Sequence, residues 1–306
     1  MDLIVNIMLG IIIAATPLVF ASIGELVVEK SGVLNLGVEG MMIVGAIAGF
    51  AATIETGSFI AGITAAALAG ALIAFLFAVL TQTLLANQVA TGLALTMFGL
   101  GLAALLGQGY SGQSAPDFPH LYIPGLTDLP VIGPLIFGQD GLVYLSFVLV
   151  AAVSWFLYRT RTGLIIRAIG ENHDAAHAIG YSVVAYRYAA LLFGGACAGL
   201  GGAYLSIVQT PLWVENMTAG RGWIALALVV FAAWRPWRAL FGAYLFGGIT
   251  IIQLHSQALG LEVEPQLLAM LPYLATIIVL VLISHDAIRA RLNAPAHLGK
   301  TFFAST

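Results

Sequence analysis

The sequence predicts an all-α, polytopic integral membrane protein. Of its 306 residues 60% are apolar, whereas the 11 Lys and Arg residues and the 14 Asp and Glu residues make up only 8%. An average soluble domain carries about a quarter charged residues, so this chain cannot cover its surface with polar groups. The mean hydropathy of +1.01 and the long apolar runs indicate that the bilayer is its main solvent.

A helix needs about twenty apolar residues to cross the hydrocarbon core of a membrane, which predicts about nine spans. The stretch between Ile23 and Gly40 is the hardest to assign, because it is too polar for lipid and too apolar for a free loop. We expect one transmembrane domain over residues 1–285 and a cytoplasmic tail over residues 286–306. The expected spans lie near residues 3–23, 40–56, 58–81, 84–106, 141–158, 187–208, 222–235, 239–259 and 268–284.

The positive residues predict the orientation, because Lys and Arg near span ends resist translocation. With nine spans, the three basic regions fall on one face, which is then the cytoplasmic face together with Lys30. The N-terminus is expected outside and the C-terminus in the cytoplasm, with only Arg221 on the far side. The basic regions contain Arg159, Arg161, Arg167 and Arg187, then Arg235 and Arg238, and finally Arg289, Arg291 and Lys300.

The connection over residues 107–140 is rich in glycine and proline and has no helical periodicity, so we expect an external loop. Loops of this length are usually functional or disordered. Two interpretations stay open: a flexible cap over the span ends, and a docking surface for an external partner.

Composition and motifs exclude several classes of function. A net charge of −3 without a basic face argues against nucleic acid, and the single Cys197 excludes an internal disulfide. The expected spans contain almost no ionisable groups, which argues against coupling to an ion gradient. Gly299-Lys300-Thr301 lacks the first glycine of a phosphate-binding loop, so we expect this chain to bind no nucleotide or other cofactor itself.

No catalytic or metal site is evident. His173 and His177 are four residues apart, with Asp174 between them, but no third ligand is apparent. Two solvated side chains are the preferred interpretation over a metal site. No arrangement of nucleophile and base stands out either, so we expect a transport subunit and not an enzyme.

The loop over residues 159–187 predicts a short docking helix. Gly170 can end one helix, Asn172 can cap the next, and Gly180 ends it. A helix of about seven residues is unstable alone in water, since isolated helices need about 12–15 residues. It must therefore dock, through the narrow apolar strip of Ala175, Ala176 and Ile179. Lipid headgroups are one candidate surface, but small alanines favour a protein groove.

The sequence GLIIRAIGENHDAAHAIGYS within this loop resembles the coupling loop of ATP-binding-cassette (ABC) importer permeases. The resemblance is to the branch that handles nucleosides, simple sugars and branched-chain amino acids. It implies that the short helix binds a groove on an ATPase subunit and transmits the closure of that subunit. The matching residues, expected to couple to the ATPase, are Gly163, Arg167, Gly170, Glu171, Asn172, Ala175, Ala176 and Gly180.

Two further blocks resemble nucleoside-type permeases of the same family, GELVVEKSGVLNLGVEGMMIVGA from Gly24 and ENMTAGRGWIALALVVFAAWRPWRALFGAYLFG from Glu215. In the first block, glycines and Asn35 among apolar residues indicate an interrupted helix. Such a segment is tolerated at membrane depth only against protein or a wet cavity. Asn35 and Glu39 are therefore candidates for the translocation path, with a simple connector between spans as the alternative.

The stretch LANQVATGLALTMFGLG is similar to the fourth span of the family. Asn87, Gln88 and Thr91 place amide and hydroxyl groups on one side of a helix, with Phe98 two turns on. These groups would suit an uncharged, flat, polar solute. Hydrogen bonding between helices is the alternative. A glycine-rich run over residues 194–202 predicts a close-packing surface.

The resemblance implies a permease subunit in a bacterial cell (inner or plasma) membrane that forms the path of an ATP-driven importer. Nucleosides or related purines are the expected solutes. A simple sugar is the alternative within the family, and a passive facilitator or secondary carrier is the alternative outside it. The implied partners are an ATPase subunit that binds ATP and Mg, a second permease, identical or homologous, an external binding protein and membrane lipid.

Overall fold

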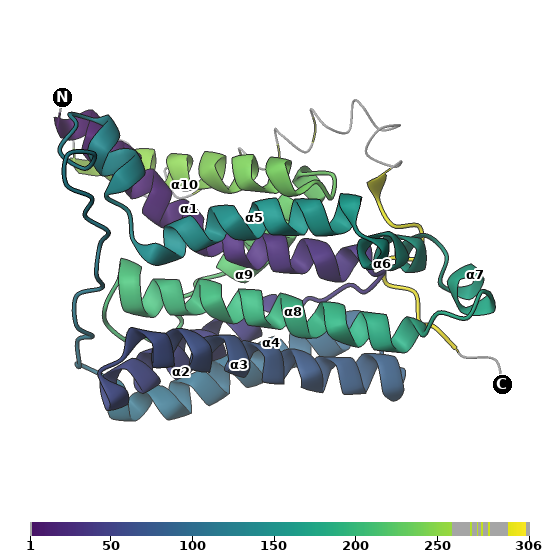
Figure 1. The fold of residues 1–306 in the computed structure, drawn as a ribbon. Helices are drawn as coiled ribbons and strands as arrows, with labels where there is room; N and C mark the ends of the chain where they lie inside the picture. Colours follow the sequence, from purple (N-terminus) through teal and green to yellow (C-terminus); the bar gives the residue numbers. More distant parts are fainter. Residues whose placement is uncertain are drawn as a thin grey trace.

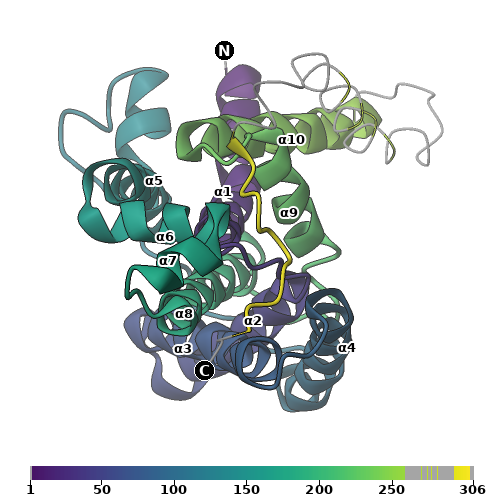
Figure 2. The same ribbon diagram turned by 90° about the vertical axis from the view of Figure 1, so that its right-hand side faces the viewer.

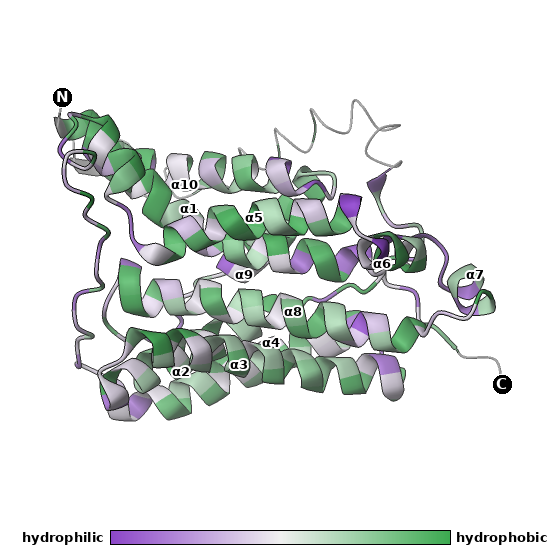
Figure 3. Cartoon of the chain, in the orientation of Figure 1, coloured by the Kyte–Doolittle hydropathy of each residue, from purple (hydrophilic) through white to green (hydrophobic). Residues whose placement is uncertain are grey.

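The computed structural model describes residues 2–258, 270, 274, 277, 281 and 293–303. Within this part the chain forms helices and no β-strand, and seven of the helices are long and apolar enough to cross a membrane. Figure 3 shows apolar residues along the long helices and hydrophilic residues gathered around α6 and α7. The predicted all-α polytopic fold is confirmed.

The long helices pack side by side in one bundle (Figure 1). Single π-helical turns extend α3 over residues 79–83 and α8 over residues 204–209. Three helices are short: α6 (Arg161–Glu171), α7 (His173–Ala178) and α9 (Arg221–Phe231). The long ones are α1 (Asp2–Lys30), α2 (Val38–Thr56), α3 (Phe59–Ala78), α4 (Gln88–Gly107), α5 (Gly141–Arg159), α8 (Val183–Ala203) and α10 (Pro236–Ala258).

Eight of the nine predicted spans correspond to helices, with two corrections. The first span does not end at residue 23, because α1 continues to Lys30. The span predicted over residues 222–235 is wrong, because α9 has 11 residues and is about 16 Å long, half the thickness of a bilayer core. The ninth predicted span, 268–284, lies outside the described residues apart from four single positions.

The two ends of the bundle differ (Figure 1). One end carries α6, α7 and the C-terminal segment 293–303, and we call it the α7 end. The other carries the N-terminus and the long loop, and we call it the loop end. That loop contains two short helical turns, 108–110 and 133–137, which its sequence did not predict.

The described residues of the predicted basic regions lie at the α7 end, while Arg289 and Arg291 lie outside the described residues. Arg235 and Arg238 line a recess with Tyr158 and Asn293, and Lys30 Nζ donates a hydrogen bond of 2.7 Å to the carbonyl oxygen of Asn293. Arg221, expected on the far side, occupies the first position of α9 and is half-buried.

Helix α8 lies at the centre of the bundle, in contact with α1, α2 and α3. Its glycines allow this. A Cβ atom at Gly199 would collide with the backbone of Ala66, and one at Gly202 would collide with the backbone of Met42. The predicted close-packing surface over residues 194–202 is confirmed, since small residues let helix backbones approach closely in membranes.

Candidate functional site

Two non-helical segments meet inside the bundle. Residues 31–37 lead from the α7 end of α1 to the start of α2, and residues 210–220 lead from the loop end of α8 to the start of α9. The predicted interruption of the helix around Asn35 is therefore confirmed. Because α9 is only half as long as a span and ends beside Glu29 near the α7 end, its first turn lies at about half the membrane depth.

Glu39 joins the two segments. Its carboxylate accepts hydrogen bonds from the backbone N–H groups of Gly220 at 2.8 Å and Gly222 at 2.6 Å, and from the hydroxyl of Thr218 at 2.5 Å. The side chain is 2% exposed. These donors form the N-terminus of α9, where the helix dipole favours a negative charge. Glu39 thus ties the start of α2 to the start of α9.

The segment 31–37 is fixed by polar side chains from α1 and α4. Asn35 donates to Glu25 Oε2 at 3.2 Å and accepts from the N–H of Gly37 at 3.0 Å. Gln88 accepts from the N–H of Leu34 at 2.8 Å, and the hydroxyl of Thr96 donates to the carbonyl oxygen of Leu36 at 3.1 Å. Backbone that leaves the helix inside a membrane needs such partners.

The predicted path residues do not form one cluster. Asn35, Glu39 and Gln88 all lie around segment 31–37 and are buried. Asn87 instead caps α4, accepting from the N–H of Ala90 at 3.0 Å, and Phe98 is 49% exposed on another face of that helix. The remaining candidate, Thr91, is half-buried beside Gly92. Their role in the translocation path stays a prediction.

The expectation that the spans contain almost no ionisable groups is wrong at the α7 end. Glu25 and Glu29 lie within α1 and are each 1% exposed, and Arg187 of α8 is fully buried. Glu29 accepts from the indole N–H of Trp234 at 2.6 Å. Glu25 and Glu29 were missed because the first span was expected to end before Glu25, whereas Arg187 was expected at the boundary of the span over residues 187–208. The polarity of the stretch between Ile23 and Gly40 was the feature of the sequence that could have indicated buried ionisable groups there.

The predicted coupling loop forms α6 and α7. Thr160 caps α6 through the N–H of Gly163, and Asn172 caps α7 through the N–H of Ala175 at 2.9 Å. Gly180 follows α7 with a φ of +93°, a conformation that favours glycine. The predicted helix, cap and stop are confirmed.

Two residues of the loop make close contacts at the α7 end. A Cβ atom at Gly170 would collide with the carbonyl oxygen of Lys30, so this glycine allows α6 to approach the end of α1. The guanidinium of Arg167 lies over the ring of Tyr158 at 5.1 Å. Glu171 is exposed at the last position of α6.

The expected apolar strip of α7 is divided between two faces. Ala176 points inwards and is 4% exposed, packed with Ile169, Val183 and Phe302. Ala175 and Ile179 face outwards, and Ile179 is 73% exposed. The exposed side of α7 therefore combines apolar Ala175 and Ile179 with polar Asp174 and His177.

His173 belongs to a polar cluster that includes a residue from the C-terminal segment, His297. Nδ1 of His173 accepts from the guanidinium of Arg187 at 3.1 Å, and Nδ1 of His297 accepts from the backbone N–H of His173 at 3.3 Å. Burial and, secondarily, the charge of Arg187 lower the pKa of His173 to about 4. Both rings are thus neutral in this arrangement.

These two histidines and Asp174 are close enough for their ligand atoms to surround a metal ion. The hydrogen bonds of the two histidines argue against a metal site. A neutral imidazole whose Nδ1 accepts a hydrogen bond carries its proton on Nε2, which leaves no lone pair for a metal. His177, the partner weighed from the sequence, instead contacts the ring of Phe302. The cluster is suited to hydrogen bonding between α7, α8 and the C-terminal segment.

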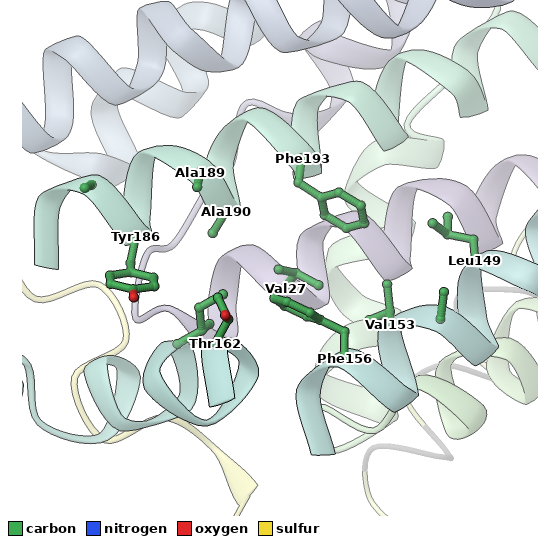
Figure 4. Close-up of a pocket in the computed structure, with 12 residues that line it drawn as sticks. Val27, Leu149, Val153, Phe156, Thr162, Tyr186, Ala189, Ala190 and Phe193 are labelled. Atoms are coloured by element: carbon green, nitrogen blue, oxygen red, sulfur yellow. The ribbon is translucent and has the colours of Figure 1, made fainter. Parts of the chain in front are cut away.

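A cavity of about 430 Å³ lies between α1, α5, α6 and α8 (Figure 4). It is lined almost entirely by apolar side chains, among them Val27, Phe156 and Phe193. None of the predicted path residues lines it, so this cavity offers little to a polar solute.

Comparison with known proteins gives consistent matches over the whole bundle. The family model described as branched-chain amino acid transport system / permease component matches residues 7–282. A putative glucose ABC transporter permease protein of Haloferax volcanii is 41% identical, over 94% of each chain. The nucleoside ABC transporter permease protein of Lactococcus lactis is 34% identical over 93% of this chain and 94% of its own.

A further relative, the guanosine ABC transporter permease protein of Bacillus subtilis, is 32% identical over 88% of this chain and 89% of its own. No solved structure gives a significant match.

Proposed function

Since the chain belongs to the family of branched-chain amino acid transport system permease components, and is a permease subunit of an ABC importer, we propose that it imports nucleosides or related purines. In this proposal it forms the translocation path together with a second permease, identical or homologous. ATP and Mg bind to a separate ATPase subunit, and an external binding protein delivers the solute.

The observation that carries the coupling part of the proposal is the outer face of α7. This helix projects from the α7 end of the bundle (Figure 1) and has only six residues. Its inner side packs on the bundle, while Ala175 and Ile179 remain exposed. A short helix whose exposed side mixes apolar Ala175 and Ile179 with polar residues suits a groove on another protein, because small side chains anchor poorly in lipid.

The mechanism we propose is alternating access. Closure of the ATPase subunits on ATP displaces α7, and the displacement reaches the interior of the bundle. There, α2 and α9 both begin at the joint made by Glu39. Discontinuous helices of this kind can tilt about their break without unfolding a whole span. Tilting would open the path alternately to the two sides of the membrane.

The solute class rests on neutral polar groups and on the relatives. Asn35 and Gln88 offer amides near the break, and two relatives carry nucleoside or guanosine permease names. A simple sugar is the second candidate, favoured by the glucose permease relative. Competition for labelled guanosine uptake separates them: excess nucleoside should abolish uptake and excess glucose should not. If labelled glucose is taken up instead, and excess glucose but not excess nucleoside abolishes its uptake, the solute is a simple sugar.

The coupling proposal is tested with Ile179→Glu in the complete importer reconstituted in vesicles. A charge on the outer face of α7 should lower ATP-driven uptake about tenfold or more, with normal insertion into the membrane. Ile132→Glu is the matched control, because Ile132 is 53% exposed at the loop end. Normal uptake by Ile179→Glu would contradict the assignment. Uptake by the permease alone, without ATPase, would instead support a passive facilitator.

A further inference from the structure

The C-terminal segment 293–303, which we call the strap, crosses the α7 end of the bundle. Figure 2 looks onto this end and shows the strap, in yellow, running across it. Its sequence lies outside the region that the coupling-loop resemblance covers. The strap nevertheless contacts the coupling helices on one side and the start of segment 31–37 on the other.

On the coupling side, the strap binds both α6 and α7. The N–H of His297 donates to the carbonyl oxygen of Gly170 at 2.9 Å, and His297 accepts from the N–H of His173 at 3.3 Å. Phe302 is 6% exposed and packs with Ile169 and Ala176 of the two coupling helices. Its ring also meets that of His173 at 5.3 Å. The inner face of α7 is therefore built partly by the strap.

On the other side, the strap binds the end of α1 and the first residues of segment 31–37. The N–H of Gly299 donates to the carbonyl oxygen of Gly32 at 3.0 Å, and Lys30 donates to Asn293. Arg187 links segment 31–37 to the strap, since it donates to the carbonyl oxygens of both Ser31 at 3.2 Å and Lys300 at 3.2 Å. From Ser31 the segment leads within eight residues to Glu39.

We propose that the strap positions α7 and transmits its movement to segment 31–37, and that Phe302 is the positioning residue on the α7 side. This inference rests on the proposed coupling function. A helix of six residues does not keep a fixed orientation by itself, and the inner contacts of α7 come in part from the strap. Movement of α7 therefore pulls on Gly32 through the strap as well as on the spans through the loop backbone.

The alternative is that movement passes only along the chain, from α6 into α5 and from α7 into α8. In that case the strap is a passive cover, and weakening it leaves the number of ATP molecules used per solute unchanged. This ratio separates the two ideas, because a merely structural loss lowers uptake and ATP hydrolysis together.

The experiment measures solute uptake and ATP hydrolysis by the complete importer in vesicles. Phe302→Ala should raise the ATP used per solute imported about fivefold, because the ATPase still cycles while α7 no longer pulls on the strap. Phe303→Ala is the matched control, since the neighbouring Phe303 is 68% exposed and should keep the ratio of the unmodified importer. Phe302→Leu, which retains apolar volume, should restore most of the coupling.

A second variant tests the other side of the strap. Lys30→Met removes the hydrogen bond to Asn293 and keeps a side chain of similar length, so the ratio should rise here too. An unchanged ratio in both Phe302→Ala and Lys30→Met would overturn the proposal. So would loss of assembly in both Phe302 variants, because the strap would then be a folding element. In either case, ATP-driven uptake by the unmodified importer would leave the proposed function intact.

Discussion

Glu39 is the residue on which the junction of the two broken helices depends. A buried carboxylate is costly in a membrane unless its oxygens are satisfied. Here three donors and the N-terminus of α9 supply that stabilisation. In the part of the chain that the structure describes, these three donors have no acceptor other than Glu39.

Replacing Glu39 with alanine should therefore destabilise the protein strongly. Glu39→Ala leaves the hydroxyl of Thr218 and two N–H groups of α9 buried without an acceptor. We expect the free energy of unfolding, measured by titrating a denaturing detergent into mild micelles, to fall by about 3 kcal/mol. Glu55→Gln is the control, because Glu55 is exposed and accepts a hydrogen bond from the exposed hydroxyl of Tyr110. A loss below that of the control would show that the joint is not stabilising.

His173 should make the docking of the strap sensitive to acid. Burial lowers its pKa from about 6.5 to about 4, and burial also lowers the pKa of His297. The separated state binds protons first, so docking is at full strength above about pH 6.5 and weakens as the pH falls toward 4. Arg187 and Lys300 oppose protonation of the cluster, while Asp174 favours it.

Hydrogen exchange of the strap amides measures this effect. After correction for the intrinsic rates, exchange at residues 297–302 should rise about tenfold between pH 7 and pH 5. His173→Asn cannot titrate and should reduce the rise, leaving the part due to His297. A rise of the same size in His173→Asn would assign the acid sensitivity to other groups.

At the scale of elements, helix type and most helix positions could be predicted from hydropathy alone. The exceptions have physical causes. Helix α1 continues past residue 23 because Glu25 and Glu29 find buried partners in Asn35 and Trp234, which a hydropathy pattern cannot reveal. Helix α9 looks like a span in sequence because residues 222–235 are apolar. The helix starts at about half the membrane depth because Glu39, far away in sequence, caps its N-terminus.

The loop that forms α6 and α7 shows the same division between local and distant determinants. Asn172 and Gly180 act on their own neighbours, so the bounds of α7 could be predicted closely. Which face of α7 points into the bundle could not be predicted, because Ala176 is turned inwards by packing with Phe302, over a hundred residues later. His297 likewise gave no signal in the sequence, since its role depends on the return of the tail to the coupling helices.

Close contact between α2 and α8 should be intolerant of a single added methyl group. A Cβ atom at Gly45 would collide with the backbone of Gly199, so Gly45→Ala should lower the free energy of unfolding by about 2 kcal/mol. Gly101→Ala is the matched control, because no neighbouring atom lies within 4 Å of its added Cβ and alanine favours a helix. Equal stabilities of the two variants would contradict the packing described.

At the scale of the whole molecule, the bundle separates a basic end, which carries α6 and α7, from a glycine- and proline-rich end. Segments 31–37 and 210–220 approach the same joint from these opposite ends. The strap and α7 thus lie on the side from which segment 31–37 enters. An ATPase that binds α7 would act on this entrance and not directly on the loop end.

This arrangement requires the α7 end to be cytoplasmic, which single cysteines can test. The native Cys197 is 2% exposed, so the unmodified chain should stay unlabelled by a membrane-impermeant thiol reagent. Tyr122→Cys lies in the long loop, where Tyr122 is 63% exposed, and should be labelled in intact cells. Ile179→Cys lies directly after α7, where Ile179 is 73% exposed. In cells that lack the ATPase subunit it should be labelled only after the membrane is opened, because positive residues keep this end inside. Labelling of Ile179→Cys in intact cells would invert the topology and separate α7 from any cytoplasmic ATPase.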